Sequence, residues 1–182
     1  FPGEAFRRRA PCEIMPLGVY CLSRGCSSGA YRAWRPPSTP LPGMSLPAMC
    51  TLIAIHRTVT GAPLVVAANR DEYLDRPAAG PSIQETSGGP VMAPRDVRAG
   101  GTWLGVNPRG VFAGVTNRRG ALTDPNLKTR GTLVFDALAA PTAREGAQII
   151  CDAPRGAFNG FNFFIADADD AFVITYDDQP AL

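Results

Sequence analysis

Histidine is almost absent from this sequence: its 182 residues include a single one, His56. A metal site built from several imidazoles is therefore not expected. The five cysteines follow no common zinc-binding spacing. The sequence thus predicts no metal site and no required cofactor.

Long apolar runs are missing as well. No stretch approaches the roughly 20 apolar residues of a transmembrane helix, so no membrane span is expected. Strong charge of one sign is also lacking, because the formal net charge is +2. Residues 1–49 carry six arginines against two glutamates, and residues 50–182 are mildly acidic. A nucleic-acid partner is not indicated, since such proteins usually present a basic face.

The first part of the chain lacks any sustained hydrophobic period. Eight of the 18 prolines lie in residues 1–49, and such a segment cannot bury enough apolar surface to offset its ordering entropy. We interpret residues 1–48 as a disordered leader, an arginine-rich transit peptide, or upstream sequence translated in frame. The last is favoured, with Met49 as the true start, because the chain opens on Phe1. Residues 49–182 form the expected folded part.

Regular structure is expected from Cys50 onward. The patterns predict three hairpins with strands at 51–57 and 64–68, 102–106 and 111–116, and 161–166 and 171–176. Helices are predicted at 131–140 and from a Thr142 capping box to about Cys151. Residues 77–101, rich in proline, glycine and serine, are predicted mainly as loop. Hairpins, then helices, then a hairpin indicate an α+β fold with antiparallel sheets.

A run of four polar residues, Asn69-Arg70-Asp71-Glu72, follows the apolar strand 64–68 directly. A buried strand delivers such residues to the rim of the core, where an arginine can orient a carboxylate and set its ionisation. The competing interpretation is a polar β-turn with a local Arg–Asp pair.

Several short motifs occur in one order along the chain. They are Met49-Cys50-Thr51, Ala68-Asn69-Arg70-Asp71-Glu72-Tyr73, Arg95-Asp96, Gly100-Gly101-Thr102-Trp103, Val115-Thr116-Asn117, Arg130-Gly131 and Asn159-Gly160-Phe161-Asn162. In this order and near this spacing they resemble the NRDE family, also called the transport and Golgi organisation 2 family. The resemblance runs from Met49 to about Tyr176.

The resemblance implies a fold similar to the N-terminal-nucleophile hydrolases, with two antiparallel sheets between helix layers (αββα). The family pattern continues beyond this chain, so the fold is expected to be incomplete at its C-terminal side. It also implies an amide or thioester hydrolase with Cys50 as nucleophile. If Met49 is removed, the α-amine of Cys50 becomes a usable base, since its reference pKa is about 7.7–8.0.

Site roles can be assigned on the same basis. Arg70 would lower the pKa of the thiol or hold a substrate carboxylate, and Asp71 would orient the α-amine. By analogy with cysteine hydrolases of this fold class, Asn117 would donate to the oxyanion. Substrate binding is assigned to Asn69, Glu72 and Trp103, with core packing as the alternative for Trp103; Cys151 is expected to pack.

A second hypothesis is a non-catalytic carrier. The family resemblance also implies haem trafficking or lipid and acyl-CoA homeostasis, with haem as a carried ligand. His56, Cys50, Met92 or a tyrosine could then supply an axial ligand, although none has a diagnostic spacing. The partner would be a small-molecule substrate or haem. The expected location is the cytoplasm, or the mitochondrion if residues 1–48 are a transit peptide.

Overall fold

The computed structural model describes residues 19–21, 50–72, 75–118 and 124–176. Its strands are β1 Val19–Cys21, β2 Thr51–Val59, β3 Ala62–Asn69, β4 Ala78–Thr86, β5 Gly89–Asp96, β6 Leu104–Val106, β7 Phe112–Asn117, β8 Phe161–Ala166 and β9 Ala171–Tyr176. Its helices are α1 Gly131–Leu138 and α2 Ala143–Cys151. The mixed composition agrees with the expected α+β class.

The strands form two antiparallel sheets. A three-stranded sheet has the order β1-β2-β3, and a six-stranded sheet has the order β4-β5-β6-β7-β8-β9. All three predicted hairpins are present, and the strands of the third begin and end at the predicted residues. Three residues of the expected leader, β1, pair with β2; the rest of residues 1–48 lies outside the described ranges.

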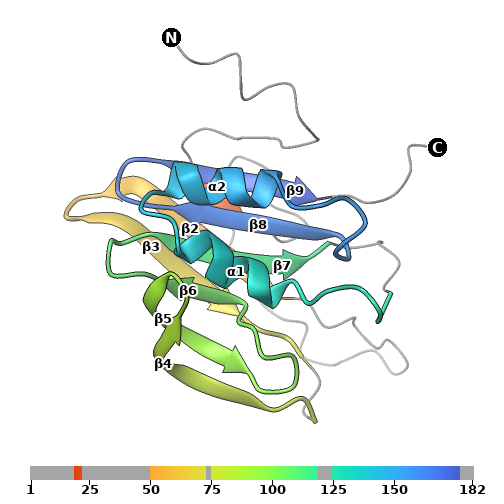
Figure 1. Cartoon of the computed structure of the whole chain (residues 1–182). Helices are drawn as coiled ribbons and strands as arrows, with labels where there is room; N and C mark the ends of the chain where they lie inside the picture. Colours follow the sequence, from red (N-terminus) through yellow and green to blue (C-terminus); the bar gives the residue numbers. More distant parts are fainter. Residues whose placement is uncertain (1–18, 22–49, 73–74, 119–123, 177–182) are drawn as a thin grey trace, which may run out of the picture.

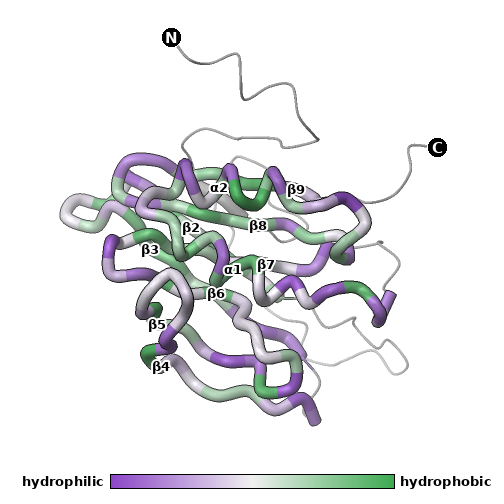
Figure 2. The backbone as a smooth tube through the Cα atoms, in the orientation of Figure 1, coloured by the Kyte–Doolittle hydropathy of each residue, from purple (hydrophilic) through white to green (hydrophobic). Residues whose placement is uncertain are grey.

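Strand β8 shows how the layers are arranged. Its odd-numbered residues Phe161, Phe163 and Ile165 join the cluster that contains the buried faces of α1 and α2. Its even-numbered residues Phe164 and Ala166 join the cluster formed with β2. Because side chains alternate along a strand, β8 has the helices on one face and the small sheet on the other. Figure 1 shows both helices across one face of the six-stranded sheet, and Figure 2 shows apolar β8 leading into a hydrophilic turn.

The prediction of a loop for residues 77–101 is wrong, because β4 and β5 form a long hairpin there. The prolines that suggested a loop are accommodated by position. The pairing shifts register between Ala79 and Ser82, which is where Pro81 and Pro94 fall. Strand β4 is also the edge of its sheet, where a missing N–H does not interrupt a ladder.

Both predicted helices are present, and each has a local anchor. The Thr142 hydroxyl accepts from the N–H of Glu145 at 3.2 Å, as expected for the N-cap of α2. Asn107, in the turn between β6 and β7, donates to the Leu138 and Ala140 carbonyls at 2.9 and 3.0 Å. This buried amide therefore holds the C-terminal end of α1 against the six-stranded sheet.

The N-terminal end of α1 crosses the segment before β6 at very short range. A Cβ placed on Gly101 would lie 2.6 Å from the carbonyl carbon of Gly131, and the Thr102 N–H donates to the Gly131 carbonyl at 3.2 Å. Only residues without a side chain permit this approach. In the described part of the chain, neither helix is long and apolar enough to span a membrane.

We expect Gly101→Ala to destabilise the protein by about 1–3 kcal/mol, the usual cost of forcing extra atoms into a packed contact. The backbones of Gly101 and Gly131 would have to separate. Gly80→Ala is the matched control, because nothing lies within 4 Å of its added Cβ. Urea unfolding of both variants checks this, and equal midpoints would show that the crossing is not tight.

Candidate active site

A cavity of about 100 Å³ lies where β2 begins, β3 and β7 end, and α1 begins. Five residues selected from the sequence line it: Cys50, Arg70, Glu72, Trp103 and Asn117. Ligand pockets for drug-sized molecules usually measure about 300–1,000 Å³. This cavity therefore fits a small group, such as one end of a substrate.

Two other selected residues, Asn69 and Asp71, do not line the cavity. Both are exposed, and the Asn69 amide donates to the Asp71 carboxylate. Alternation explains the division, because Arg70 and Glu72 have the opposite parity and point into the cavity. Asp71 still borders Cys50 through its backbone, whose carbonyl oxygen lies 3.9 Å from the Cys50 Sγ.

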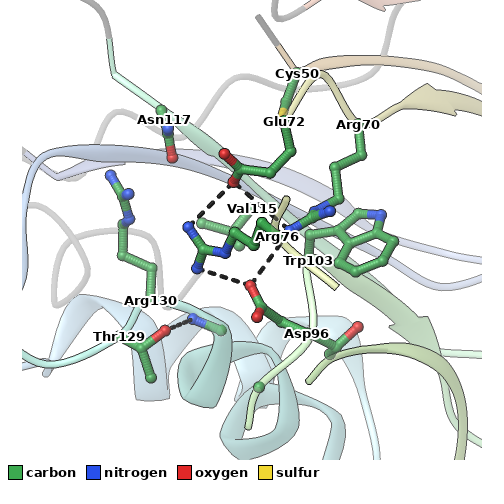
Figure 3. Close-up of a pocket in the computed structure, with 13 residues that line it drawn as sticks. Cys50, Arg70, Glu72, Arg76, Asp96, Trp103, Val115, Asn117, Thr129 and Arg130 are labelled. Carbon is green, nitrogen blue, oxygen red and sulfur yellow. Dashed lines mark hydrogen bonds and ion pairs between the residues drawn. The ribbon is translucent and has the colours of Figure 1, made fainter. Parts of the chain in front are cut away.

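Four charged side chains form a closed ring at the cavity wall. Arg70 Nη2 lies 3.6 Å from Glu72 Oε2 and 3.4 Å from Asp96 Oδ2. Arg76 Nη1 lies 3.1 Å from the same Glu72 oxygen, and its Nη2 lies 2.8 Å from Asp96 Oδ2. Figure 3 shows this alternation of positive and negative groups. We call Arg70, Glu72, Arg76 and Asp96 the charge ring.

Asp96 is the most firmly held member of the ring. Its Oδ1 accepts from the N–H groups of Arg98 and Ala99 at 3.1 and 2.9 Å, while its Oδ2 faces both arginines. Burial opposes ionisation, but these donors and charges outweigh it and hold the pKa of Asp96 below its usual value. Asp96 is therefore a fixed anion.

The Cys50 side chain is partly buried and carries a free thiol. Burial is the main cause that raises the pKa of this thiol above its usual value. The Glu72 carboxylate adds to that effect, and the Arg70 guanidinium opposes it. Arg70 thus acts in the expected direction without prevailing, so the thiol is mostly protonated at neutral pH.

Trp103 supports the ring from below. Its indole lies under the Arg70 guanidinium, 4.6 Å from ring centroid to the guanidinium carbon, which is the geometry of a cation–π contact. The side chain is partly buried and lines the cavity. Trp103 therefore lies in the cavity wall and not in the main core.

Sequence reasoning missed Arg130 as a site residue, although the Arg130-Gly131 motif had been noticed. Arg130 is the residue before α1, and its Nη1 donates to the Gly160 carbonyl at 3.1 Å. Burial, followed by the positive charge of Arg76, lowers the pKa of Arg130 below its usual value. Figure 3 shows its guanidinium extending toward Asn117. Arg76 and Asp96 were also missed as site residues, although the Arg95-Asp96 motif contributes to the family resemblance.

The other residues named as candidate haem ligands lie elsewhere. His56 is a buried residue of β2, and its Nε2 lies 2.9 Å from the Asp167 carbonyl oxygen. Met92 is on β5 and 43% exposed, away from the cavity. Cys151 packs against the main core, as expected. In the described ranges, no three His, Cys, Asp or Glu residues gather as metal ligands do.

Two antiparallel sheets, helices on one face and a cysteine beside a charge ring define an α+β protein with a thiol-bearing pocket. The chain belongs to the Transport and Golgi organisation 2 family, whose model matches residues 49–181.

Three curated relatives agree with this assignment. The chain is 35% identical over 118 residues to the Transport and Golgi organization protein 2 homolog of Bos taurus, covering 62% of this chain and 42% of that protein. It is 32% identical to the mouse homolog over 109 residues (57% and 38%) and 32% to the human homolog over 113 residues (59% and 40%). The chain thus spans about two fifths of these relatives.

Alkylation of Cys50 by iodoacetamide should have its pH midpoint above that of an ordinary cysteine, because burial raises the thiol pKa. Arg70→Gln should move the midpoint further up, since it removes a positive charge that favours the thiolate. Arg144→Gln, at an exposed site on α2, is the control. Mass spectrometry of the Cys50 peptide across pH gives the midpoint, and a downward shift in Arg70→Gln would contradict this account.

Asp96→Asn should lower the free energy of unfolding at pH 7 by about 2 kcal/mol, somewhat less than the 3–5 kcal/mol typical of breaking a fully buried pair. Because the folded pKa of Asp96 is depressed, its contribution is complete above the ordinary carboxyl pKa of about 3.9 and disappears as pH falls through the folded value. The variant should therefore lose less stability between pH 5 and acid than the parent.

Denaturant titrations across that pH range measure the difference. Asp75→Asn, at an exposed position, should stay within about 0.5 kcal/mol of the parent at every pH. If the free energy of unfolding falls equally with acidification in Asp96→Asn and in the parent, the ring does not hold Asp96 ionised.

Proposed function

We propose that this chain supplies the nucleophilic half of a cysteine acyl hydrolase acting on an amide or a thioester. The observation that carries the proposal is the position of the Cys50 thiol, at the head of β2 in a small charged cavity. Helices, a six-stranded sheet and a three-stranded sheet follow one another in that order, which supports three layers of an N-terminal-nucleophile αββα fold.

The proposed reaction needs a base, because the thiol pKa is raised and no histidine is available at the cavity: the only one, His56, is buried elsewhere. Cleavage before Cys50 would provide its own α-amine. The amine takes the thiol proton as Sγ bonds to the carbonyl carbon, then gives that proton to the departing amine or thiolate. Water, deprotonated by the same amine, then attacks the acyl carbon. The C–Sγ bond breaks, the carboxylic acid leaves, and the amine returns the proton to Sγ.

Asn117 is the proposed oxyanion donor. It ends β7 on the cavity wall, and its side chain amide is exposed there rather than tied into the sheet. A donor of this kind typically contributes 10²–10³-fold to the rate. The charge ring has a different role in this proposal, since it fixes the end of β3 next to Cys50.

The carrier hypothesis has less support from the geometry. Of the ligands considered for haem, Cys50 lines the cavity, whereas His56 and Met92 do not. A cavity of about 100 Å³ also suits a small acyl end better than a macrocycle.

A chain processed to begin at Cys50 should hydrolyse at least one member of a panel of chromogenic amides and thioesters, and Cys50→Ala should abolish that turnover. Asn117→Ala should lower kcat by about 10²–10³-fold. Asn69→Ala is the matched control, because this asparagine also ends a strand but lies outside the cavity. Turnover that survives Cys50→Ala would refute the proposal.

A further inference from the structure

The arginines of the cavity differ in how their charges are balanced. Arg70 and Arg76 each face both Glu72 and Asp96 within the charge ring, so two cations meet two anions. Arg130 is the third arginine on the wall. Among the described residues, no carboxylate forms an ion pair with it, and its guanidinium donates a hydrogen bond to the neutral Gly160 carbonyl.

Arg130 is partly buried. A guanidinium that has lost part of its hydration raises the free energy of the folded protein unless an anion balances its charge. Taking a charge out of water disfavours it, and proteins normally pair such groups. Burial is the main cause that lowers the pKa of Arg130, and the positive charge of the nearby Arg76 is the second cause. The two ring anions are already shared by two arginines, so they offset the charge of Arg130 only in part.

The position of Arg130 gives the uncompensated charge a use. The residue lies between Thr129 and the first residue of α1, and all three line the cavity with Cys50. The end of the helix adds a positive potential to that of the guanidinium. Figure 3 shows the guanidinium on the side of the cavity where Asn117 lies, next to the charge ring.

We propose that Arg130 anchors a carboxylate of the compound that Cys50 attacks, so the substrate class is an acyl compound with a negatively charged group near its reacting carbonyl. That the compound is a substrate rests on the proposed function, whereas the anion site does not depend on it. The planar guanidinium matches a carboxylate fork, and the cavity volume suits a group of that size. Arg70, the sequence-based candidate for this role, is already committed to the ring.

Two alkylating reagents of nearly equal size isolate the charge. Iodoacetate and iodoacetamide form the same C–S bond with loss of iodide, but only iodoacetate carries a carboxylate. The ratio of their rates at Cys50 in the full chain, compared with the ratio at a cysteine in an unstructured peptide, should favour iodoacetate about tenfold. That is the scale of one charge-assisted hydrogen bond. Acetate should slow the iodoacetate reaction in a saturable way.

Arg130→Gln should return the ratio to the peptide value while leaving the iodoacetamide rate within about twofold, and Arg130→Lys should keep part of the preference. A change in thiol pKa or a loss of folding would alter both rates together, so the ratio separates these effects from anion binding. Arg144→Gln, an exposed arginine on α2, should change nothing.

The proposal is overturned if Arg130→Gln keeps the iodoacetate preference, or if only Arg70→Gln removes it. Hydrolysis can fail independently. If the chain prefers iodoacetate as expected but the processed chain shows no turnover, the hydrolase proposal is refuted and the anion site stands. If the processed chain shows turnover but no preference for iodoacetate, the anion site is refuted and the hydrolase proposal stands.

Discussion

The charge ring is the constraint on which the site depends. Its acids and arginines come from the end of β3, from the segment before β4 and from the end of β5, so it ties the small sheet to the large one. Asp96 is central because one oxygen fixes the turn that follows β5 while the other faces both arginines. This junction adds to the apolar contacts between β2 and β8, and together they fix Cys50 on one side of the cavity relative to Arg130 on the other.

The parts of the fold that could be predicted are those whose pattern is local. The strands of the third hairpin alternate or run apolar over six residues on either side of an aspartate-rich turn, and the structure keeps those limits. Strands β4 and β5 were missed because their proline and glycine content is typical of a loop. Edge position and a register shift make those residues acceptable, and both are properties of the assembled sheet rather than of the segment.

The site shows the same division between local and assembled information. The polar run after β3 marked the correct place, but strand parity then sends Arg70 and Glu72 inward and leaves Asn69 and Asp71 exposed. Which pair faces inward could not be read from the preceding strand, because residues 64–68 are all apolar and show no alternation. The contribution of Arg130 could not be predicted either, because it depends on the Gly101–Gly131 crossing that sets the start of α1 against the cavity.

The electrostatics of the cavity also bear on how a thiol could react there. A ring with equal numbers of positive and negative groups holds the structure together but gives Cys50 little net help in ionising, and burial then raises its pKa. A neutral nucleophile requires a base at hydrogen-bonding distance, and His56 is bound to the Asp167 carbonyl away from the cavity. In the proposed reaction the base is the α-amine that cleavage before Cys50 would free. A second cation beside the thiol, Arg130, would then serve the acyl compound rather than the sulfur, because its charge is the one that the ring does not balance.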